Sequence, residues 1–250
     1  MGQFFDQTKL PYICTPLTGK TTTQLLEQLD NILEKEPDMI EWRADFFEHL
    51  YNEADVFSII KAIKEKTTIP LLFTIRSIHE GGETISLTEA EKVSLLCNVC
   101  KETNVDLIDY ETSNDKKDVE LVVKTAKKHD KQIVLSFHHF EHTPSEDELI
   151  ERAKNAAKFH ADIIKLAVMP EEKEDVFRLL EVTRILDDMF EQPIITMSMG
   201  ELGALSRING WLYGSVLTFA VGIEQSAPGQ IAIEPLREAI WNTKQLMPNW

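Results

Sequence analysis

The feature that most constrains the fold of this chain is a regular alternation of short apolar runs with longer segments of helical periodicity. Eight runs rich in apolar and β-branched residues predict strands, at residues 11–17, 38–45, 69–77, 105–111, 132–140, 161–169, 193–199 and 215–222. Eight segments of helical period follow them, at 21–36, 53–66, 87–103, 118–130, 145–160, 172–190, 200–214 and 234–246. Repeated strand–helix units of about 30 residues predict a parallel sheet with its helices packed outside.

The length and the first turn decide between two parallel-sheet architectures. A closed (β/α)8 TIM barrel typically needs about 250 residues, and the chain has 250. An open doubly wound sheet usually carries a glycine-rich turn after its first strand, whereas TPLTGKTTT at 15–23 contains a single glycine. No linker or change of composition divides the chain. We therefore expect an α/β protein, with one (β/α)8 barrel catalytic domain spanning residues 1–250.

Composition narrows the choice of partners. A formal net charge of −16 disfavours nucleic acid and anionic membranes. The sequence shows no apolar run long enough to span a bilayer and no signal peptide at its start, so we expect a cytoplasmic protein. The cysteines at 14, 97 and 100 fit a reducing compartment, and Cys97 and Cys100 are interpreted as buried thiols of a helix rather than metal ligands. The expected partner is a small molecule, which would need a local cationic pocket if it is an anion.

Lys165 lies inside a predicted strand, between apolar residues on both sides. A lysine on a sheet usually marks an exposed edge, but a closed barrel has no edge strand. Burying an unpaired ammonium costs several kcal/mol unless the amine becomes neutral, and a neutral amine is a nucleophile. The sequence therefore predicts an uncharged Lys165 in an apolar environment, helped by cations such as Arg43 and placed to form a Schiff base with a carbonyl substrate.

Polar residues at the ends of other predicted strands supply the remaining groups that Schiff-base chemistry needs, because these ends form the active-site face of a barrel. His138 ends the neighbouring strand and is a candidate general base. Glu80 could fix the tautomer of its imidazole. Arg43, Arg76 and Arg207 are candidate ligands for a substrate carboxylate, since a guanidinium can bind both oxygens at once.

Six ordered segments resemble a known protein family. They are EWRAD (41–45), FTIRSIHEGGE (73–83), SFHHF (136–140), KLAVMP (165–170), SMGELGALSR (198–207) and SAPGQ (226–230). In this order, and at the ends of predicted strands, they resemble the type I 3-dehydroquinate dehydratases over nearly the whole chain. The resemblance implies a homodimeric TIM-barrel enzyme, without metal or cofactor, that converts 3-dehydroquinate to 3-dehydroshikimate in the shikimate pathway.

The resemblance also implies a role for each matching residue. Lys165 would form a Schiff base with the ring ketone. His138 would take a proton from the adjacent carbon and protonate the leaving hydroxyl, which makes the elimination syn, while Glu80 orients and assists it. Arg207 would hold the ring carboxylate. The other substrate ligands would be Glu41, Arg43, Arg76, Ser226 and Gln230, the last two on a loop that closes over the ring.

One position departs from the family pattern. A second histidine, His139, follows His138, where the family more often has Asp or Asn. Alternation along a strand points His139 away from the barrel axis, which favours His138 as the base.

Residue patterns alone leave three other functions open. An aldolase acting on a phosphorylated sugar or keto acid would also use Lys165, although the last two loops lack a glycine-rich phosphate cradle. A metal-dependent hydrolase would use Glu41, Glu111 and His138 as ligands. A non-catalytic barrel is disfavoured by the cost of keeping so many charged groups buried. Asp109, at the end of the strand before His138, is interpreted as a structural ion-pair partner.

Overall fold

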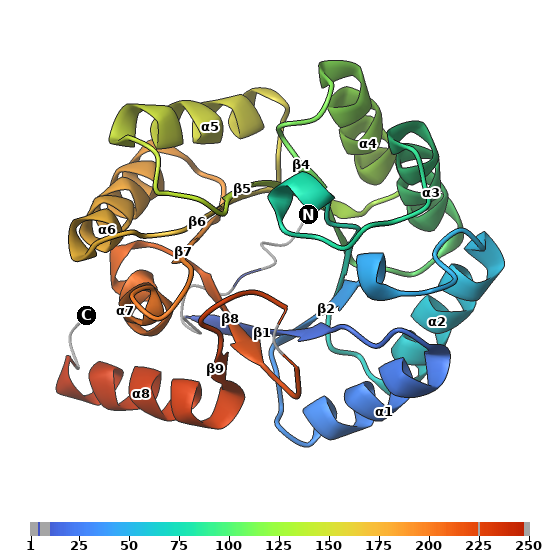
Figure 1. Ribbon diagram of the computed structural model, residues 1–250, viewed down its shortest axis with the longest axis horizontal. Helices are drawn as coiled ribbons and strands as arrows, with labels where there is room; N and C mark the ends of the chain where they lie inside the picture. Colours follow the sequence, from blue (N-terminus) through green and yellow to red (C-terminus); the bar gives the residue numbers. More distant parts are fainter. Residues whose placement is uncertain (1–4, 6–10, 225, 248–250) are drawn as a thin grey trace.

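The computed structural model describes residues 5, 11–224 and 226–247; the expected domain limits, residues 1 and 250, lie outside them. The predicted (β/α)8 barrel is confirmed, with strands in the centre and helices around them (Figure 1). Each predicted apolar run contains a strand: β1 Tyr12–Leu17, β2 Met39–Arg43, β3 Leu71–Thr74, β4 Leu107–Glu111, β5 Gln132–His139, β6 Ile163–Val168, β7 Ile194–Ser198 and β8 Leu217–Val221.

Neighbouring strands pair in parallel in the order β7-β6-β5-β4-β3-β2-β1-β8. The barrel closes between β7 and β8 through a single bridge, Ile194 with Ser215, and a 2.9 Å hydrogen bond from the Val216 amide to the Ile194 carbonyl. A two-residue strand that the sequence did not predict, β9 (Ile231–Ala232), extends the sheet beside β8.

The helices largely match the segments of helical period. Their bounds are α1 Thr22–Leu33, α2 Glu53–Lys66, α3 Glu89–Glu102, α4 Lys116–Lys128, α5 Glu146–Lys158, α6 Lys173–Met189, α7 Ala204–Asn209 and α8 Ile233–Leu246. A capping box begins α3, because Thr88 and Glu91 each accept a backbone N–H from the other. Within the described residues, no helix is both long enough and apolar enough to cross a membrane.

The predicted helix at 200–214 is wrong in its extent. Only α7 is α-helical, and a 3-10 turn over Gly210–Tyr213 continues it. Before Ala204 the chain forms turns closed by i→i−3 hydrogen bonds, from the Gly203 and Ala204 amides to the Gly200 and Glu201 carbonyls, each 3.2 Å long. Shorter 3-10 turns at Ala44–Phe46 and Ile78–Glu80 follow β2 and β3. Asp45 lies on the first turn and Glu80 on the second, and both are buried.

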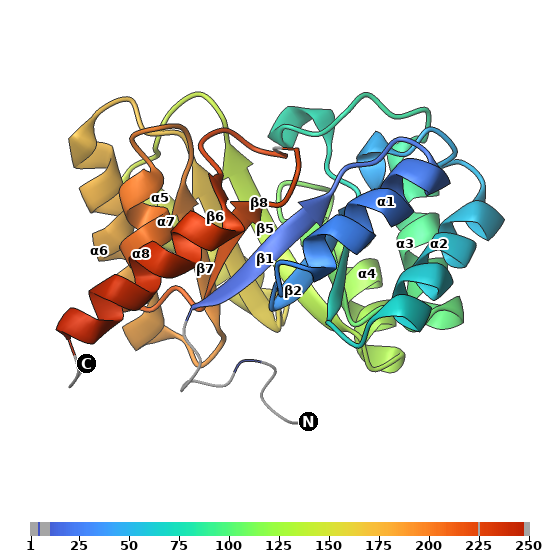
Figure 2. The same ribbon diagram turned by 90° about the horizontal axis from the view of Figure 1, so that it is seen from below.

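The barrel interior changes character along its axis. At the amino-terminal ends of the strands it is filled by apolar side chains, including Met39, Leu107, Ile163 and Leu217. Side chains two residues further along a strand lie on the same face, and there the sequence places Glu41, Asp109, Lys165 and Phe219, all buried. The apolar layer therefore lies toward the amino-terminal ends of the strands, and the layer with Glu41, Asp109 and Lys165 lies toward their carboxyl ends. Figure 2 shows the loops that follow these carboxyl ends at the top of the barrel.

Candidate active site

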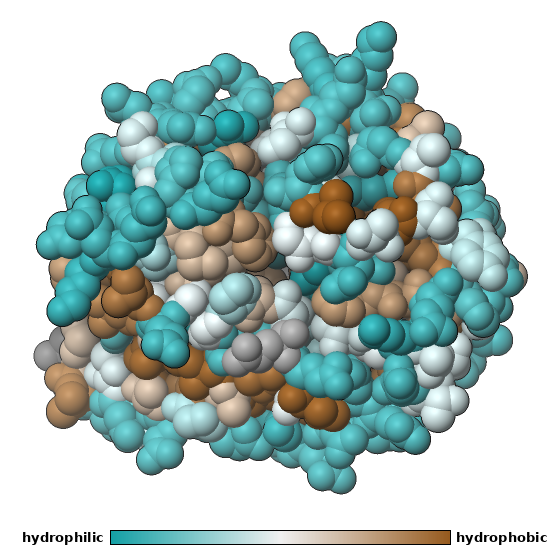
Figure 3. Space-filling view, in the orientation of Figure 1, coloured by the Kyte–Doolittle hydropathy of each residue, from teal (hydrophilic) through white to brown (hydrophobic). Residues whose placement is uncertain are grey.

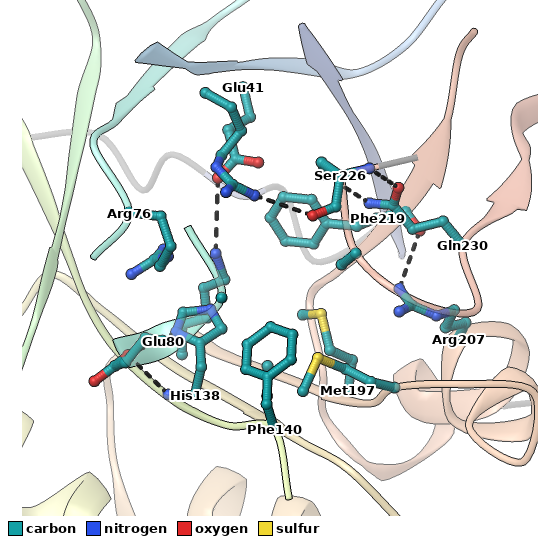
Figure 4. Close-up of a pocket in the computed structure, with 16 residues that line it drawn as sticks. Glu41, Arg76, Glu80, His138, Phe140, Met197, Arg207, Phe219, Ser226 and Gln230 are labelled. Atoms are coloured by element: carbon teal, nitrogen blue, oxygen red, sulfur yellow. Dashed lines mark hydrogen bonds and ion pairs between the residues drawn. The ribbon is translucent and has the colours of Figure 1, made fainter. Parts of the chain in front are cut away.

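The nine residues singled out from the sequence all line one pocket at the carboxyl ends of the strands. The pocket is also lined by apolar side chains, among them Phe140, Met197 and Met199. The space-filling view shows the outer rim of this face as mainly hydrophilic, with apolar residues nearer its middle (Figure 3). Glu80 and His138 lie on one side of the pocket, and Arg207, Ser226 and Gln230 lie on the opposite side (Figure 4).

Lys165 does not lie in the apolar environment that the sequence predicts. Its Nζ is 3.2 Å from Asp109 Oδ2 and 3.8 Å from Glu41 Oε1, and it lies 4.6 Å from the centre of the Phe219 ring. Two carboxylates beside a buried amine stabilise its protonated form. The expectation of an apolar environment is therefore wrong, because inward-facing residues of β2 and β4 supply carboxylates that are remote in sequence.

Asp109 is a buried ion-pair partner, as the sequence predicts, and Lys165 is one of its partners. It forms an ion pair with Arg76 at 2.8 Å and accepts a hydrogen bond from Ser136 Oγ at 2.7 Å, besides its contact with Lys165. Arg76 in turn contacts Glu111 at 3.1 Å, and Glu111 binds the buried Lys92 of α3 at 2.8 Å. Alternation along β4 signals that Asp109 and Glu111 share a face, but no local pattern links Lys92 to the pocket.

His138 and Glu80 form the histidine–carboxylate contact expected from the sequence. Glu80 Oε2 lies 2.9 Å from both Nδ1 and the backbone nitrogen of His138. Burial, followed by the cations Arg76 and Lys165, holds the pKa of His138 well below its usual value. Burial also raises the pKa of Glu80 to about 7, against the opposing effect of Arg76. The imidazole is therefore neutral at pH 7, and an ionised Glu80 keeps the proton on Nδ1, leaving Nε2 as the basic nitrogen.

His139 has different surroundings. It does not line the pocket; its ring centre lies 4.0 Å from that of His142 and 6.3 Å from that of Phe137. The predicted divergence of the two adjacent histidines is confirmed by this geometry.

Arg43 is held by a residue that sequence reasoning passed over. Both oxygens of buried Asp45 accept from the Arg43 guanidinium, at 2.9 and 2.8 Å. The same carboxylate accepts from the backbone N–H groups of Arg76 and Glu83, at 3.2 and 3.1 Å. Asp45 thus fixes one arginine and ties β2 to the loop that carries Glu80. The position of Asp45 two residues after Arg43 is the sequence feature that could have predicted this contact.

Arg207 differs from the other arginines. Its guanidinium donates to the backbone carbonyls of Phe219 and Pro228, at 3.3 and 3.0 Å. Among the described residues no carboxylate pairs with it, and its buried Nε has no acceptor. Burial lowers the pKa of Arg207 to about 10, so the side chain remains charged at pH 7. A buried cation that is satisfied only by neutral carbonyls is suited to an incoming anion.

The buried charges around the pocket balance except at Arg207. In the described part of the chain, four buried cations each lie beside at least one of four carboxylates. Arg43 pairs with Asp45, Arg76 with Asp109 and Glu111, Lys92 with Glu111, and Lys165 with Asp109 and Glu41. These charges cancel. Arg207 is left as the pocket cation without a carboxylate partner among the described residues, so an anionic ligand fits best next to it.

The loop after β8 lies across the mouth of the pocket. Arg43 donates to the Ser226 carbonyl at 3.2 Å, and Arg207 donates to the Pro228 carbonyl. Gln230 accepts from the Ser226 backbone N–H at 2.9 Å and donates to its hydroxyl at 3.1 Å. Two pocket arginines thus hold the described part of this loop.

The ligand set of the rival metal-dependent hydrolase does not assemble. Across the described ranges no cluster of three or more His, Cys, Asp or Glu has the geometry of a metal site. Glu111, one of its expected ligands, is occupied by Lys92 and Arg76. The cysteine interpretation is confirmed, because Cys97 and Cys100 are both buried on α3.

Fold and pocket together define a (β/α)8-barrel enzyme built around a buried lysine and a histidine–carboxylate pair. The model of one protein family, type I 3-dehydroquinase, matches residues 13–246. The 3-dehydroquinate dehydratase of Albidiferax ferrireducens is 44% identical over 247 residues, covering 98% of this chain and 94% of that protein. One from Geobacillus sp. is 42% identical over 231 residues, with 92% and 89% covered. The chain belongs to the type I 3-dehydroquinase family and is a dehydratase of that type.

Solved structures agree with this assignment. The 3-dehydroquinate dehydratase of Geobacillus kaustophilus superposes with a TM-score of 0.92 at 39% identity, covering 94% of this chain and 91% of that one. The type I enzyme of Clostridium difficile, solved with covalently modified comenic acid, gives a TM-score of 0.91 at 35% identity, with 95% and 94% covered. A 3-hexulose-6-phosphate synthase, at 18% identity and a TM-score of 0.61, shares the fold alone.

Proposed function

We propose that this enzyme dehydrates 3-dehydroquinate to 3-dehydroshikimate through a Schiff base on Lys165, with His138 as general acid and base. The observation that carries the proposal is the convergence of the lysine and the histidine in one pocket. Lys165 is paired with Ser136 across the β5–β6 ladder, and His138 lies two residues further on the same face. A small ring bound to Lys165 is therefore within reach of the imidazole.

The proposed reaction has three chemical phases: condensation, elimination, and hydrolysis of the product iminium by one water, which releases 3-dehydroshikimate and frees Lys165. Lys165 condenses with the ring ketone to give an iminium, which acidifies the neighbouring carbon. Nε2 of His138 removes a proton from that carbon to give an enamine, and the protonated imidazole then donates to the departing hydroxyl. One imidazole serves both steps, so the proton and the hydroxyl leave from the same side of the ring. Glu80 orients His138 and stabilises its charged form when the carboxyl is ionised.

Substrate binding in this proposal depends on the charge distribution of the pocket. Arg207 carries the uncompensated charge, and we assign it to the ring carboxylate. We assign the binding of the substrate hydroxyls to Glu41, Arg43 and Arg76, which line the pocket from β2 and the end of β3. Ser226 and Gln230 belong to the loop over the mouth, which would open to admit substrate and close to exclude water.

The relatives support a covalent route without extending it to this chain. The structure from Clostridium difficile contains covalently modified comenic acid. Four expectations from the sequence stay predictions. They are homodimeric assembly, a place in the shikimate pathway leading to aromatic amino acids, cytoplasmic residence, and a single catalytic domain over 1–250. Light scattering after size exclusion tests the dimer.

The experiment that tests the proposal is an assay with 3-dehydroquinate that follows the absorbance of the conjugated enone. We expect Lys165→Ala to abolish turnover. His138→Ala should lower kcat by about two to four orders of magnitude, since that is the usual contribution of a general acid–base group.

The adjacent histidine provides the matched control. His139→Ala should keep most of the activity because its ring faces away from the pocket. Turnover by Lys165→Ala at the wild-type rate would overturn the covalent route, and activity lost in His139→Ala but kept in His138→Ala would transfer the base.

A further inference from the structure

Asp109 contacts the reacting nitrogen, yet the roles assigned so far leave it unused. Its Oδ2 lies 3.2 Å from Lys165 Nζ, closer than the 3.8 Å of Glu41. Lys165 and Asp109 are both buried, so solvent screens their interaction weakly. The charge on this nitrogen therefore depends mainly on these two carboxylates.

The carboxylate of Asp109 is built to remain an anion. Arg76 binds its Oδ1 at 2.8 Å and Ser136 donates to the same oxygen at 2.7 Å. Burial alone would raise the pKa of Asp109, but Arg76 and then Lys165 lower it to about 2. Such a weak base does not take a proton from the lysine. What it supplies to the nitrogen is a fixed negative charge.

The position of that charge is also fixed. Arg76 is held from its other side by Glu111, at 3.1 Å, and Glu111 is held by Lys92, at 2.8 Å. Alternating buried charges thus run from α3 to the floor of the pocket and restrain the carboxylate of Asp109. Oδ2 stays directed at the lysine nitrogen.

We propose that Asp109 is a catalytic residue, the permanent counterion of the Lys165 nitrogen in both its ammonium and its iminium forms. In the free enzyme it keeps the amine protonated. After condensation the nitrogen keeps one hydrogen and its positive charge, and Asp109 Oδ2 accepts from that N–H. This inference rests on the proposed Schiff base and adds to it the charge state of the covalent step.

The step balances without a proton from solvent. The ammonium and the ketone give the iminium and one water: the carbonyl oxygen leaves with two of the three ammonium hydrogens, and the third stays on nitrogen. The C–N double bond replaces the C–O double bond, and the charge is +1 before and after. The neutral imidazole of His138 is a suitable carrier of those protons to the oxygen.

Removing the counterion changes this balance. In Asp109→Asn the buried nitrogen loses its nearest anion and keeps only Glu41, at 3.8 Å, while Arg76 remains, so we expect the neutral amine to be the resting form in the alkaline half of the pH range. Condensation of a neutral amine to an iminium takes up one proton. Covalent binding then falls about tenfold for each unit rise in pH, as linkage requires for one bound proton.

The test measures that difference by trapping. Wild type and Asp109→Asn are equilibrated with subsaturating 3-dehydroquinate and its product from about pH 6 to about pH 9. Sodium cyanoborohydride reduces the iminium, and intact-protein mass gives the modified fraction. We expect the ratio of variant to wild type to fall about tenfold per pH unit across the alkaline half of this range. Both proteins contain Glu80, so its titration changes the two modified fractions equally and cancels in their ratio.

Two variants serve as controls. Ser136→Ala removes a hydrogen bond from the same carboxylate but keeps its charge, and Asp109→Glu restores the charge. For both, the ratio to wild type should stay flat with pH. A flat ratio for a folded Asp109→Asn would overturn the proposal, as would a sloping ratio for Ser136→Ala.

A second measurement needs no variant, in case Asp109→Asn fails to fold. Calorimetric titration of wild type with the product, in two buffers of different ionisation enthalpy near pH 8, reports proton uptake. We expect none, and uptake of one proton would overturn the proposal. If Lys165 is not trapped in wild type at any pH, the Schiff base itself fails. If Lys165 is trapped but the pH ratios or the proton uptake contradict these expectations, the Schiff base stands and only the role of Asp109 is rejected.

Discussion

At the scale of single residues, Glu80 shows how catalysis and stability oppose each other in this pocket. Its carboxyl is buried, and burial raises its pKa to about 7 from an ordinary value of 4.5. The folded state therefore binds a proton between these values that the unfolded chain has released. Stability from this group is complete below the unfolded pKa and decreases as pH rises toward 7. The ionised form that orients His138 is the costly one.

We predict that Glu80→Gln is more stable than wild type at alkaline pH. Glutamine mimics the protonated carboxyl and does not titrate, so the gain should be near zero at about pH 4.5 and reach about 3 kcal/mol above about pH 7. Urea unfolding of both proteins at several pH values measures it. The same variant should lose at least about tenfold in kcat, because the neutral amide stabilises the protonated His138 less well.

A gain in stability that is equal at all pH values would show that Glu80 is not the titrating group. Glu91 provides a matched control on the surface. It has the opposite shift, because hydrogen bonds from Thr88 lower its pKa, so Glu91→Gln should give no gain in stability at alkaline pH.

The surroundings of Lys165 differ from those expected from its neighbours along the chain. Lys165 was expected to lie in an apolar environment because its neighbours along the chain are apolar. Its actual neighbours in space are Asp109 and Glu41, from β4 and β2. A barrel interior brings alternate residues of different strands together, and a single sequence does not specify which of them meet.

At the scale of elements, the loop between β8 and α8 depends on one glycine. Gly229 has a φ of +74°, and a Cβ at this position would lie 2.1 Å from the carbonyl oxygen of Gly200. The Gly200 amide donates to the Pro228 carbonyl at 3.1 Å. The loop is thus docked on the turn after β7 through a backbone contact that tolerates no side chain.

We predict that Gly229→Ala displaces this loop and weakens substrate binding. The substitution conflicts with both the left-handed backbone and the contact with Gly200. Because the docked loop carries Ser226 and Gln230, KM should rise about tenfold, equivalent to about 1.4 kcal/mol, with a smaller effect on thermal stability. Steady-state kinetics and thermal unfolding measure the two effects.

Gly210→Ala is the matched control for this substitution. A Cβ there would meet Ser215 at 3.5 Å, an ordinary contact, and the φ of Gly210 is −56°. Its KM should stay near that of wild type. A KM for Gly229→Ala that is also unchanged would mean that the docked loop does not contribute to binding.

At the scale of the whole molecule, the barrel has one weak seam. β7 and β8 are joined by a single bridge, and the side chain of Ser215 takes over part of the ladder there. Its Oγ accepts from the Thr196 amide at 3.1 Å and lies within 3.4 Å of the Thr196 carbonyl. A buried hydroxyl thus closes the ring of strands.

We predict that Ser215→Ala destabilises the fold by about 1–3 kcal/mol, because it leaves the buried Thr196 amide without an acceptor. Urea unfolding measures the change. Ser58, on the exposed side of α2, donates to the Asp55 carbonyl, and Ser58→Ala should change stability by less than about 0.5 kcal/mol. Equal effects of the two substitutions would mean that Ser215 does not secure the seam.

The sequence by itself determined the architecture and the membership of the pocket. Apolar periodicity predicted all eight barrel strands, since alternation of burial follows from the geometry of strands and helices, and barrel topology then brought the nine singled-out residues to one mouth. Tertiary structure alone decided the pairing of charges that are remote in sequence: Asp109 with Lys165, Lys92 with Glu111, and no carboxylate with Arg207 among the described residues. The physical reason is range. Secondary structure is encoded by spacing within a few residues, whereas the charge of a buried group depends on every side chain within a few ångströms, whatever its position in the chain.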